Sequence, residues 1–231
     1  MAECDIKLLG SWASPFVLRA RIALNLKSVA YEFVQENLGA KSELLLRSNP
    51  VHKKVPVLIH GDKPVCESLV IVEYVDEAWS SGPAILPADP YERSVARFWA
   101  AYLDDKWFPL LKEIAKAGDE EAKKAAAEQV TESLLLLERV FEKSSKGKAF
   151  FGGDGIGHLD IALGSFLGWA RVTESMNGVK VFDEAKTPRL AEWAEVFCAD
   201  GAVKDVMPET PKLVEFAKVI FARMKAAAAA Q

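Results

Sequence analysis

Short apolar runs alternate with helix-like periodicity over the first 80 residues of the chain. A buried strand is predicted at residues 6–9, closed by Gly10, and a helix follows from Pro15, where apolar residues recur at helical spacing. The other elements predicted here are a strand at 31–34, a short helix at 41–47, strands at 55–59 and 64–66 joined by a turn, and a helix from 68.

The pattern changes after residue 80. Residues 81–91 hold three prolines and one glycine, which is typical of a linker. Beyond the linker, apolar residues recur every 3.6 positions, and the predicted helices cover 95–106, 130–141, 158–176, 188–198 and 211–225. The order β-α-β-α-β-β-α points to a thioredoxin-like α/β domain at residues 1–80. We expect an all-α helical domain at residues 92–231.

Composition and charge argue against several classes of function. The 231 residues are 50% hydrophobic with a net charge of −4, so the chain lacks the basic excess that nucleic acid or an anionic membrane surface requires. No run approaches the roughly 20 apolar residues of a membrane span, and the N-terminus lacks a signal-peptide pattern. Three widely spaced cysteines, Cys4, Cys66 and Cys198, favour a reducing compartment. We expect a cytosolic protein that binds neither nucleic acid nor membrane.

Three junctions carry candidate chemistry. Ser14 lies between the first strand and the first helix, where it is either an ordinary N-cap or a hydroxyl that donates to an anion. Pro56 interrupts a strand-like run, which fits an edge strand or a cis bond that turns the Val55 backbone outward as a docking edge. At the next strand-to-helix junction, Ser68 is an N-cap or Glu67 reaches an ammonium group.

The spacing of these motifs resembles the glutathione transferase superfamily. The segments SWASPFVLRARIAL, NPVHKKVPVLIH and CESLVIVEYVDEAW are similar to its plant tau class, and GDGIGHLDIAL resembles the family's capping motif in the second domain. This resemblance implies a homodimeric enzyme that conjugates glutathione to hydrophobic electrophiles, herbicides among them, in detoxification and stress response. Peroxide reduction by the same thiolate is a further option. Glutathione is then a co-substrate, and neither a cofactor nor a metal is expected.

The resemblance also implies roles for individual residues. Ser14 would donate its hydroxyl to the glutathione sulfur and hold it as a thiolate, without acting as a nucleophile itself. Lys53 stands beside Lys54, which leaves the choice between these two lysines open. The implied glutathione contacts are Lys41 and Lys54 at the glycine carboxylate, the Val55 backbone before a cis Pro56, and Glu67 and Ser68 at the γ-glutamyl end.

The electrophile would lie across the domain cleft. Its implied walls are Trp12, Phe16, Phe108, Leu111 and Trp169. Aromatic residues at helical spacing equally fit a plain core. Pro109 removes a helical hydrogen bond, which predicts a kink near Asp105 that would turn Phe108 toward the cleft.

The second-domain capping motif departs from the family's pattern at one position. Gly157 stands where the family has Ser or Thr, three residues before Asp160. Glycine has no side-chain oxygen, so half of the reciprocal cap is missing. We expect the helix to form nevertheless, with Asp160 in a structural role.

Three other functions make different demands on the sequence. A cysteine-dependent thiol transferase or dehydroascorbate reductase needs a Cys where Ser14 stands, because a mixed disulfide must form there. A serine hydrolase needs a GxSxG elbow, which the sequence lacks. A non-enzymatic carrier of hydrophobic ligands would use the same apolar cleft, so this alternative stays open, as does the natural electrophile.

Overall fold

A four-stranded sheet organises the N-terminal part of the chain in a computed structural model, which describes residues 5–229. The strand order is β2-β1-β3-β4. Strand β1 pairs in parallel with β2, with Leu8 opposite Phe33, and antiparallel with β3, with Leu8 opposite Leu58. The β3–β4 pair is a hairpin. The strands are β1 (Ile6–Gly10), β2 (Glu32–Gln35), β3 (Val57–His60) and β4 (Lys63–Cys66).

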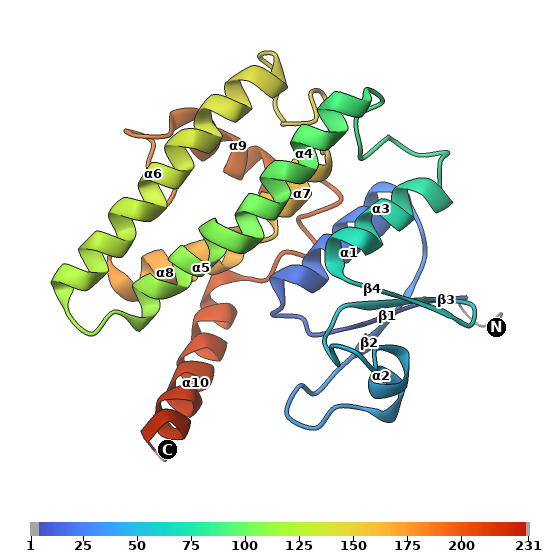
Figure 1. Cartoon of the computed structure of the whole chain (residues 1–231), viewed down its shortest axis with the longest axis horizontal. Coiled ribbons are helices and arrows are strands. Elements are labelled where there is room, and N and C mark those ends of the chain that lie inside the picture. The colour runs from blue at the N-terminus through green and yellow to red at the C-terminus, as the bar shows by residue number, and fades with distance from the viewer. Residues whose placement is uncertain (1–4, 230–231) are drawn as a thin grey trace.

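Three helices cover this sheet on its two faces. Helices α1 (Pro15–Leu26) and α3 (Ser68–Ala78) pack together on one face, and α2 (Glu43–Ser48) lies on the other (Figure 1). The side chains of β1 alternate accordingly. Leu8 joins the main core with α1 and α3, whereas Leu9 packs in a separate cluster with Leu45 of α2. The predicted thioredoxin-like arrangement is therefore confirmed.

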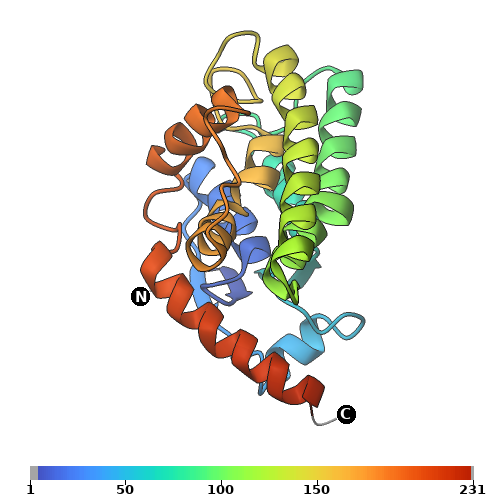
Figure 2. The ribbon, with the colours of Figure 1, turned by 90° about the vertical axis from the view of Figure 1, so that its left-hand side faces the viewer.

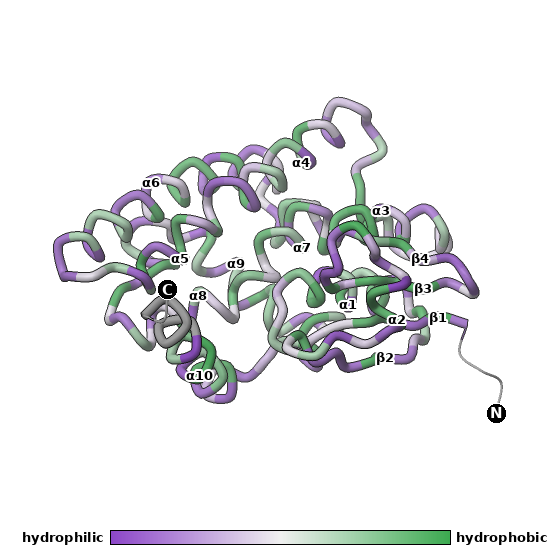
Figure 3. Tube along the Cα trace, turned by 60° about the horizontal axis from the view of Figure 1, so that its bottom comes forward, coloured by the Kyte–Doolittle hydropathy of each residue, from purple (hydrophilic) through white to green (hydrophobic). Residues whose placement is uncertain are grey.

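The rest of the chain is helical, as predicted. Figure 2 shows α4 and α6 side by side, with α10 running obliquely below them. Helix α7 is buried along its whole length, and Figure 3 shows it as a hydrophobic stretch beside α1. The elements are α4 (Pro90–Tyr102), a π-helical turn η1 (Leu103–Trp107), α5 (Phe108–Lys116), α6 (Glu120–Ser145), α7 (His158–Gly164), α8 (Leu167–Asn177), α9 (Pro188–Ala199) and α10 (Thr210–Ala229). No helix in the described part of the chain is long and apolar enough to cross a membrane.

The helical domain departs from regular helix at two places, η1 and the α7–α8 junction. The disruption predicted near Asp105 is present as the π-helical turn η1, because Pro109 has no N–H to donate to the preceding turn. The single helix predicted over 158–176 is wrong, since α7 and α8 are separate. The chain turns at Phe166 (φ −89°, ψ −9°), and Gly164 lies so close to the Phe197 ring that a Cβ would be 2.3 Å from it.

The segment between α3 and α4 is held by hydrogen bonds. The Asp76 carboxylate accepts from the backbone N–H groups of Ile85 (3.0 Å) and Leu86 (2.9 Å), and it pairs with the buried Lys27 ammonium at 2.7 Å. The Ile85 carbonyl in turn accepts from the His158 backbone at 2.9 Å. The expected linker is therefore tied to α1, α3 and α7.

Asp160 holds the start of α7, as predicted. Its Oδ1 accepts from Phe151 N (2.9 Å) and Trp193 Nε1 (2.7 Å), and its Oδ2 accepts from the backbone N–H groups of Gly152 and Gly157, both at 2.9 Å. Burial raises the pKa of Asp160 to about 6, although the four donors oppose this rise by stabilising the carboxylate. Gly152 and Gly157 approach closely here, since a Cβ on Gly152 would lie 2.8 Å from Gly157 N. The Asp160 carboxylate is thus held by three backbone N–H groups and one indole N–H.

His158 is buried beside this cap in a neutral form. Its Nε2 lies 3.7 Å from Glu73 Oε1, and neither ring nitrogen has a hydrogen-bond partner among the described residues. Burial lowers the pKa of His158 to about 4 from its ordinary 6.5, while the Glu73 carboxylate opposes the decrease. The unfolded chain therefore takes up a proton at this residue at a higher pH than the folded chain does.

This difference predicts a loss of stability in acid. Above pH 6.5, His158 does not lower the free energy of unfolding, because it is neutral in both states. As the pH falls toward 4, only the unfolded state is protonated at this residue, so the free energy of unfolding decreases. Between pH 7 and 4, wild type should lose about 3 kcal/mol of unfolding free energy relative to His158→Leu. Urea unfolding at several pH values measures this difference. His52→Leu, at an exposed histidine, is the control, and equal pH slopes in wild type and His158→Leu would contradict the assignment.

Candidate active site

Ser14 is the N-cap of α1. Its backbone is extended (φ −82°, ψ 121°), and its Oγ accepts a hydrogen bond from Val17 N at 3.3 Å. The N-cap interpretation is therefore correct, but it engages only a lone pair of the hydroxyl oxygen. The hydroxyl hydrogen stays available to donate, so the cap and a role as donor to an anion are compatible. The α1 N-terminus adds its partial positive charge at the same place.

The loop before Ser14 is fixed by both parts of the molecule. Trp12 N donates to Gln35 Oε1 of β2 at 3.2 Å, and the Trp12 ring contacts Phe216 of α10 with centroids 5.3 Å apart. The Ala13 carbonyl accepts from Trp169 Nε1 of α8 at 2.8 Å. Ser14 consequently sits where β1, α8 and α10 meet.

Phe16, two residues after Ser14, belongs to a cluster of aromatic rings. Phe16 makes edge contacts with Phe108 and Phe166, both with centroids 5.8 Å apart, and Phe108 stacks on Phe166 at 4.2 Å. Four of the five expected electrophile residues, Trp12, Phe16, Phe108 and Trp169, are partly exposed. Leu111 differs, because it lies in the main core with 2% of its surface exposed. The structure thus leaves Leu111 little surface for a substrate.

The Val55–Pro56 peptide bond is cis, which resolves the choice left open by the sequence. The loop before it is organised by the buried Asn49, whose Nδ2 donates to the Lys54 carbonyl at 3.0 Å and whose Oδ1 accepts from His52 N at 3.0 Å. Asn49 was not singled out from the sequence. It shapes the backbone that carries Lys54 and Val55.

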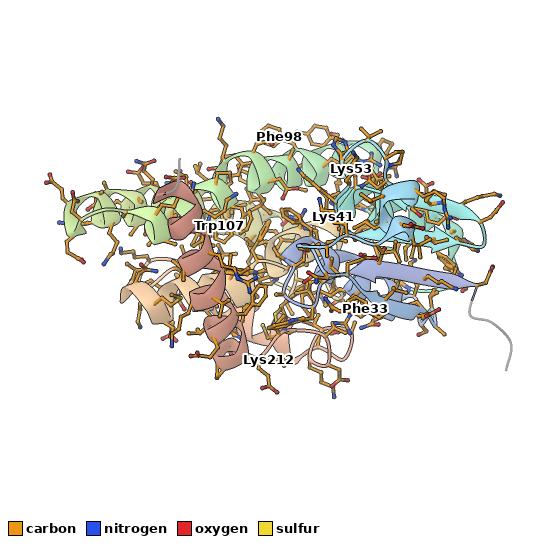
Figure 4. The ribbon with its side chains drawn as sticks, turned by 90° about the horizontal axis from the view of Figure 1, so that it is seen from below. Phe33, Lys41, Lys53, Phe98, Trp107 and Lys212 are labelled. Atoms are coloured by element: carbon orange, nitrogen blue, oxygen red, sulfur yellow. The ribbon has the colours of Figure 1, made fainter. Side chains whose placement is uncertain are left out.

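The three candidate lysines are exposed and lie on the two loops that flank α2. Lys41 precedes the helix, whereas Lys53 and Lys54 follow it, and Figure 4 labels Lys41 and Lys53. Ser42 fixes the first loop, since its Oγ donates to the buried Glu36 carboxylate at 2.7 Å and accepts from Leu45 N at 3.0 Å. Because all three lysines are already exposed, they can approach an anion near α2 without first moving out of the protein interior.

Glu67 occupies an unusual backbone conformation before α3. Its φ is +70°, a region that non-glycine residues rarely adopt, and its exposed carboxylate lies 3.8 Å from His52 Nε2. Glu67 is the N-cap residue of α3 and makes no side-chain cap bond, so the interpretation of Ser68 as N-cap is wrong. Ser68 is instead the first helical residue, and its Oγ accepts from Arg19 Nη1 at 3.2 Å.

Arg19 connects Ser68 to the helical domain. Its guanidinium is fully buried and pairs with the Asp104 carboxylate at 2.6 and 2.9 Å. It also donates to Ser165 Oγ and to the Ala162 carbonyl, both at 3.1 Å. Because Arg19 occupies a lone pair of Ser68, the Ser68 hydroxyl hydrogen stays available to donate. The sequence offered little signal for this role beyond a charged residue among the apolar positions of α1.

The sheet, the cis-proline loop, the serine at the α1 N-terminus and the following helices define a protein with a thioredoxin-like domain joined to a helical domain. Family models of the glutathione S-transferase N-terminal domain and C-terminal domain match residues 4–77 and 120–195. The chain belongs to the glutathione S-transferase family and, within it, to the plant tau class.

Individual relatives match nearly the whole chain. Glutathione S-transferase U17 of Arabidopsis thaliana is 65% identical over 227 residues, which cover 98% of this chain and 100% of that protein. A tau class glutathione S-transferase of mango has 69% identity and a TM-score of 0.91, with 94% and 99% of the two chains covered. A rice enzyme solved in complex with glutathione has 38% identity and a TM-score of 0.87, with 96% and 99% covered.

The Arg19–Asp104 pair predicts that removing either of two neighbouring carboxylates has very different effects on the free energy of unfolding. Asp104→Ala should lower the free energy of unfolding by about 3 kcal/mol, because it leaves a buried guanidinium without its counter-charge. Asp105→Ala, at the exposed neighbouring residue, should change it by less than about 0.5 kcal/mol. Chemical unfolding of both variants measures the contrast. Equal stability of the two variants would show that Arg19 does not need Asp104.

Proposed function

We propose that this chain conjugates the thiolate of glutathione to hydrophobic electrophiles, and that the Ser14 hydroxyl stabilises the thiolate. The observation that supports this most is the position of Ser14 as N-cap of α1, with its hydroxyl hydrogen available beside a helix N-terminus. A thiol with a pKa near 8.5 needs roughly 2.7 kcal/mol to lower that value by about two units. A hydrogen bond to a charged sulfur contributes about 1.5–3 kcal/mol, and the helix terminus about 0.3–1.

Glutathione would extend from Ser14 along the loops around α2 and α3. Lys41 and Lys54 would face the glycine carboxylate, and the Val55 backbone would pair with the cysteinyl unit. Glu67 and Ser68 would hold the γ-glutamyl end, with Glu67 near the ammonium group. The exposed carboxylate of Glu67 and the Ser68 hydroxyl, whose lone pair Arg19 occupies, support this orientation.

The electrophile would lie against the partly exposed rings around Ser14. Trp12, Phe16, Phe108 and Trp169 offer apolar contact area, which suits a broad range of hydrophobic electrophiles, including herbicides, in detoxification. The enzyme would act in the cytosol as a homodimer. Glutathione would be its co-substrate, and no cofactor or metal would be needed. Light scattering of the purified chain measures the dimer directly.

The role of Ser14 leads to a direct kinetic test. Ser14→Ala should lower kcat for conjugation of glutathione to a chlorinated nitroaromatic by about 100-fold, because the thiolate loses its donor. Glutathione binding, measured by calorimetry, should persist. Asp89→Ala removes the equivalent N-cap of α4, where Asp89 accepts from Glu92 N at 2.9 Å, and it should leave kcat unchanged.

Two results would change this picture. Full turnover by Ser14→Ala would remove Ser14 from the mechanism. Binding of glutathione by wild type without turnover of any of several electrophiles would favour a carrier of hydrophobic ligands over an enzyme.

The aromatic wall has its own prediction. Phe108→Ala should raise KM for hydrophobic electrophiles by about five-fold and leave KM for glutathione unchanged, because it removes apolar contact at one end of the site. Phe98→Ala, at an exposed aromatic residue on the outer side of α4, is the matched control. Steady-state kinetics with two electrophiles of different size measure both constants. An unchanged KM for every electrophile would place Phe108 outside the binding site.

A further inference from the structure

Two lysines lie over rings of the aromatic wall, the set of rings proposed above to contact the electrophile. Lys112 Nζ of α5 lies 4.8 Å from the centroid of the Phe108 ring, and Lys212 Nζ of α10 lies 4.8 Å from the centroid of the Trp12 ring. Figure 4 labels Lys212. The proposed function gives neither lysine a role, although each places a positive charge at the surface that the electrophile would meet.

Helix geometry brings each lysine to its ring. Lys112 follows Phe108 by four residues in α5, so the two side chains lie on the same face of the helix. Lys212 lies in the first turn of α10, and Phe216, four residues further along, contacts Trp12 with ring centroids 5.3 Å apart. One face of α10 thus offers Trp12 both an apolar contact and a cation.

The positive charges of these two lysines are not neutralised by an ion pair in the described part of the chain. The acidic residues that follow them in sequence are paired with other lysines, since Glu113 binds Lys116 at 2.8 Å and Glu215 binds Lys218 at 2.6 Å. An aromatic ring attracts a cation through its quadrupole but carries no net charge. The ring contacts therefore hold the two ammonium groups in place and leave their charge uncompensated.

Arg19 differs from the two lysines in this respect. Its guanidinium also lies over a ring of the aromatic wall, 5.2 Å from the centroid of Phe16. That guanidinium is buried and binds the Asp104 carboxylate at 2.6 Å, so its charge is already matched within the protein. Lys112 and Lys212 are both exposed. They are therefore cations that a substrate at the aromatic wall can approach.

From these contacts we infer that Lys112 and Lys212 are specificity-determining residues, which make the site prefer electrophiles that carry a carboxylate or sulfonate away from the reacting carbon. The inference rests on the proposed function, because it concerns turnover by the glutathione thiolate. The apolar part of the electrophile lies against the rings, and its anionic group lies beside a lysine ammonium. This attraction raises kcat/KM only for the charged compound, so it separates electrophiles of the same shape.

Two chlorinated nitroaromatics of nearly the same shape test this preference. 4-Chloro-3,5-dinitrobenzoate carries a carboxylate opposite its chlorine, and 4-chloro-3,5-dinitrobenzamide is its neutral counterpart. In both reactions the glutathione sulfur bonds to the carbon that carries chlorine, and chloride leaves with the bonding electron pair. The value of kcat/KM for each compound is divided by its uncatalysed rate constant with glutathione, which removes the difference in intrinsic reactivity.

Wild type should favour the benzoate by about ten-fold on this normalised scale, as expected for two exposed charge contacts. Lys112→Met and Lys212→Met should each lower the preference by about three-fold, and the double variant should nearly abolish it. In about 0.5 M NaCl the wild-type preference should weaken, because exposed charges are screened. The KM for glutathione should stay unchanged in all variants.

Lys143→Met is the matched control. Lys143 is an exposed lysine of α6 that likewise has no ion pair among the described residues, so its removal changes the net charge equally and should leave the preference unchanged. Equal normalised kcat/KM for the two compounds in wild type would overturn the inference while the transferase activity stands. An equal loss of preference in Lys143→Met, Lys112→Met and Lys212→Met would also overturn it. Absence of turnover of both compounds by glutathione-bound wild type would overturn the proposed function, and the inference with it.

Discussion

A buried guanidinium is stable only when its N–H groups all find acceptors, and that requirement joins the parts of this protein. Arg19 of α1 meets it through Asp104 in η1, Ser68 at the start of α3, and the α7–α8 junction. None of these partners is near Arg19 in sequence, so the full set forms only when the sheet domain and the helical domain are in contact. The same interaction that holds the two domains together also holds Ser68, one of the two residues proposed to bind the γ-glutamyl end.

The π-helical turn η1 supplies one of the partners of Arg19. Pro109 breaks the regular hydrogen bonding between α4 and α5, and the wider π-helical turn that results contains Asp104. Trp107, at the end of the same turn, is buried against Phe166, the ring on which Phe108 stacks. One irregular turn thus supplies both the partner of Arg19 and the entry to the aromatic wall. The irregular turn η1 therefore lies where the two domains and the candidate site meet.

The sequence predicted what depends on local chemistry. Ser14 before Pro15 specified a helix start, and the position of Asp160 specified the α7 cap, because each signal lies within a few residues of its effect. The sequence did not reveal Arg19, since its partners lie 49 to 146 positions away. It left open whether Ser68 is a cap, because the strained backbone of Glu67 cannot be inferred from residue type. The break between α7 and α8 was missed for a similar reason, as the close approach of Phe197 to Gly164 is a tertiary contact.

The anchoring of the 84–89 segment by Asp76 affects how substrates are selected. An interdomain connection usually acts as a hinge, which lets an enzyme close over a ligand and adapt the width of its site. Here the connection is fastened to α1, α3 and α7 at once, through Lys27, the Asp76 carboxylate and the His158 backbone. The domains are thus expected to keep one relative orientation. Differences in substrate range between this chain and its relatives would then arise from exchanges of individual side chains around the aromatic wall, with the scaffold unchanged.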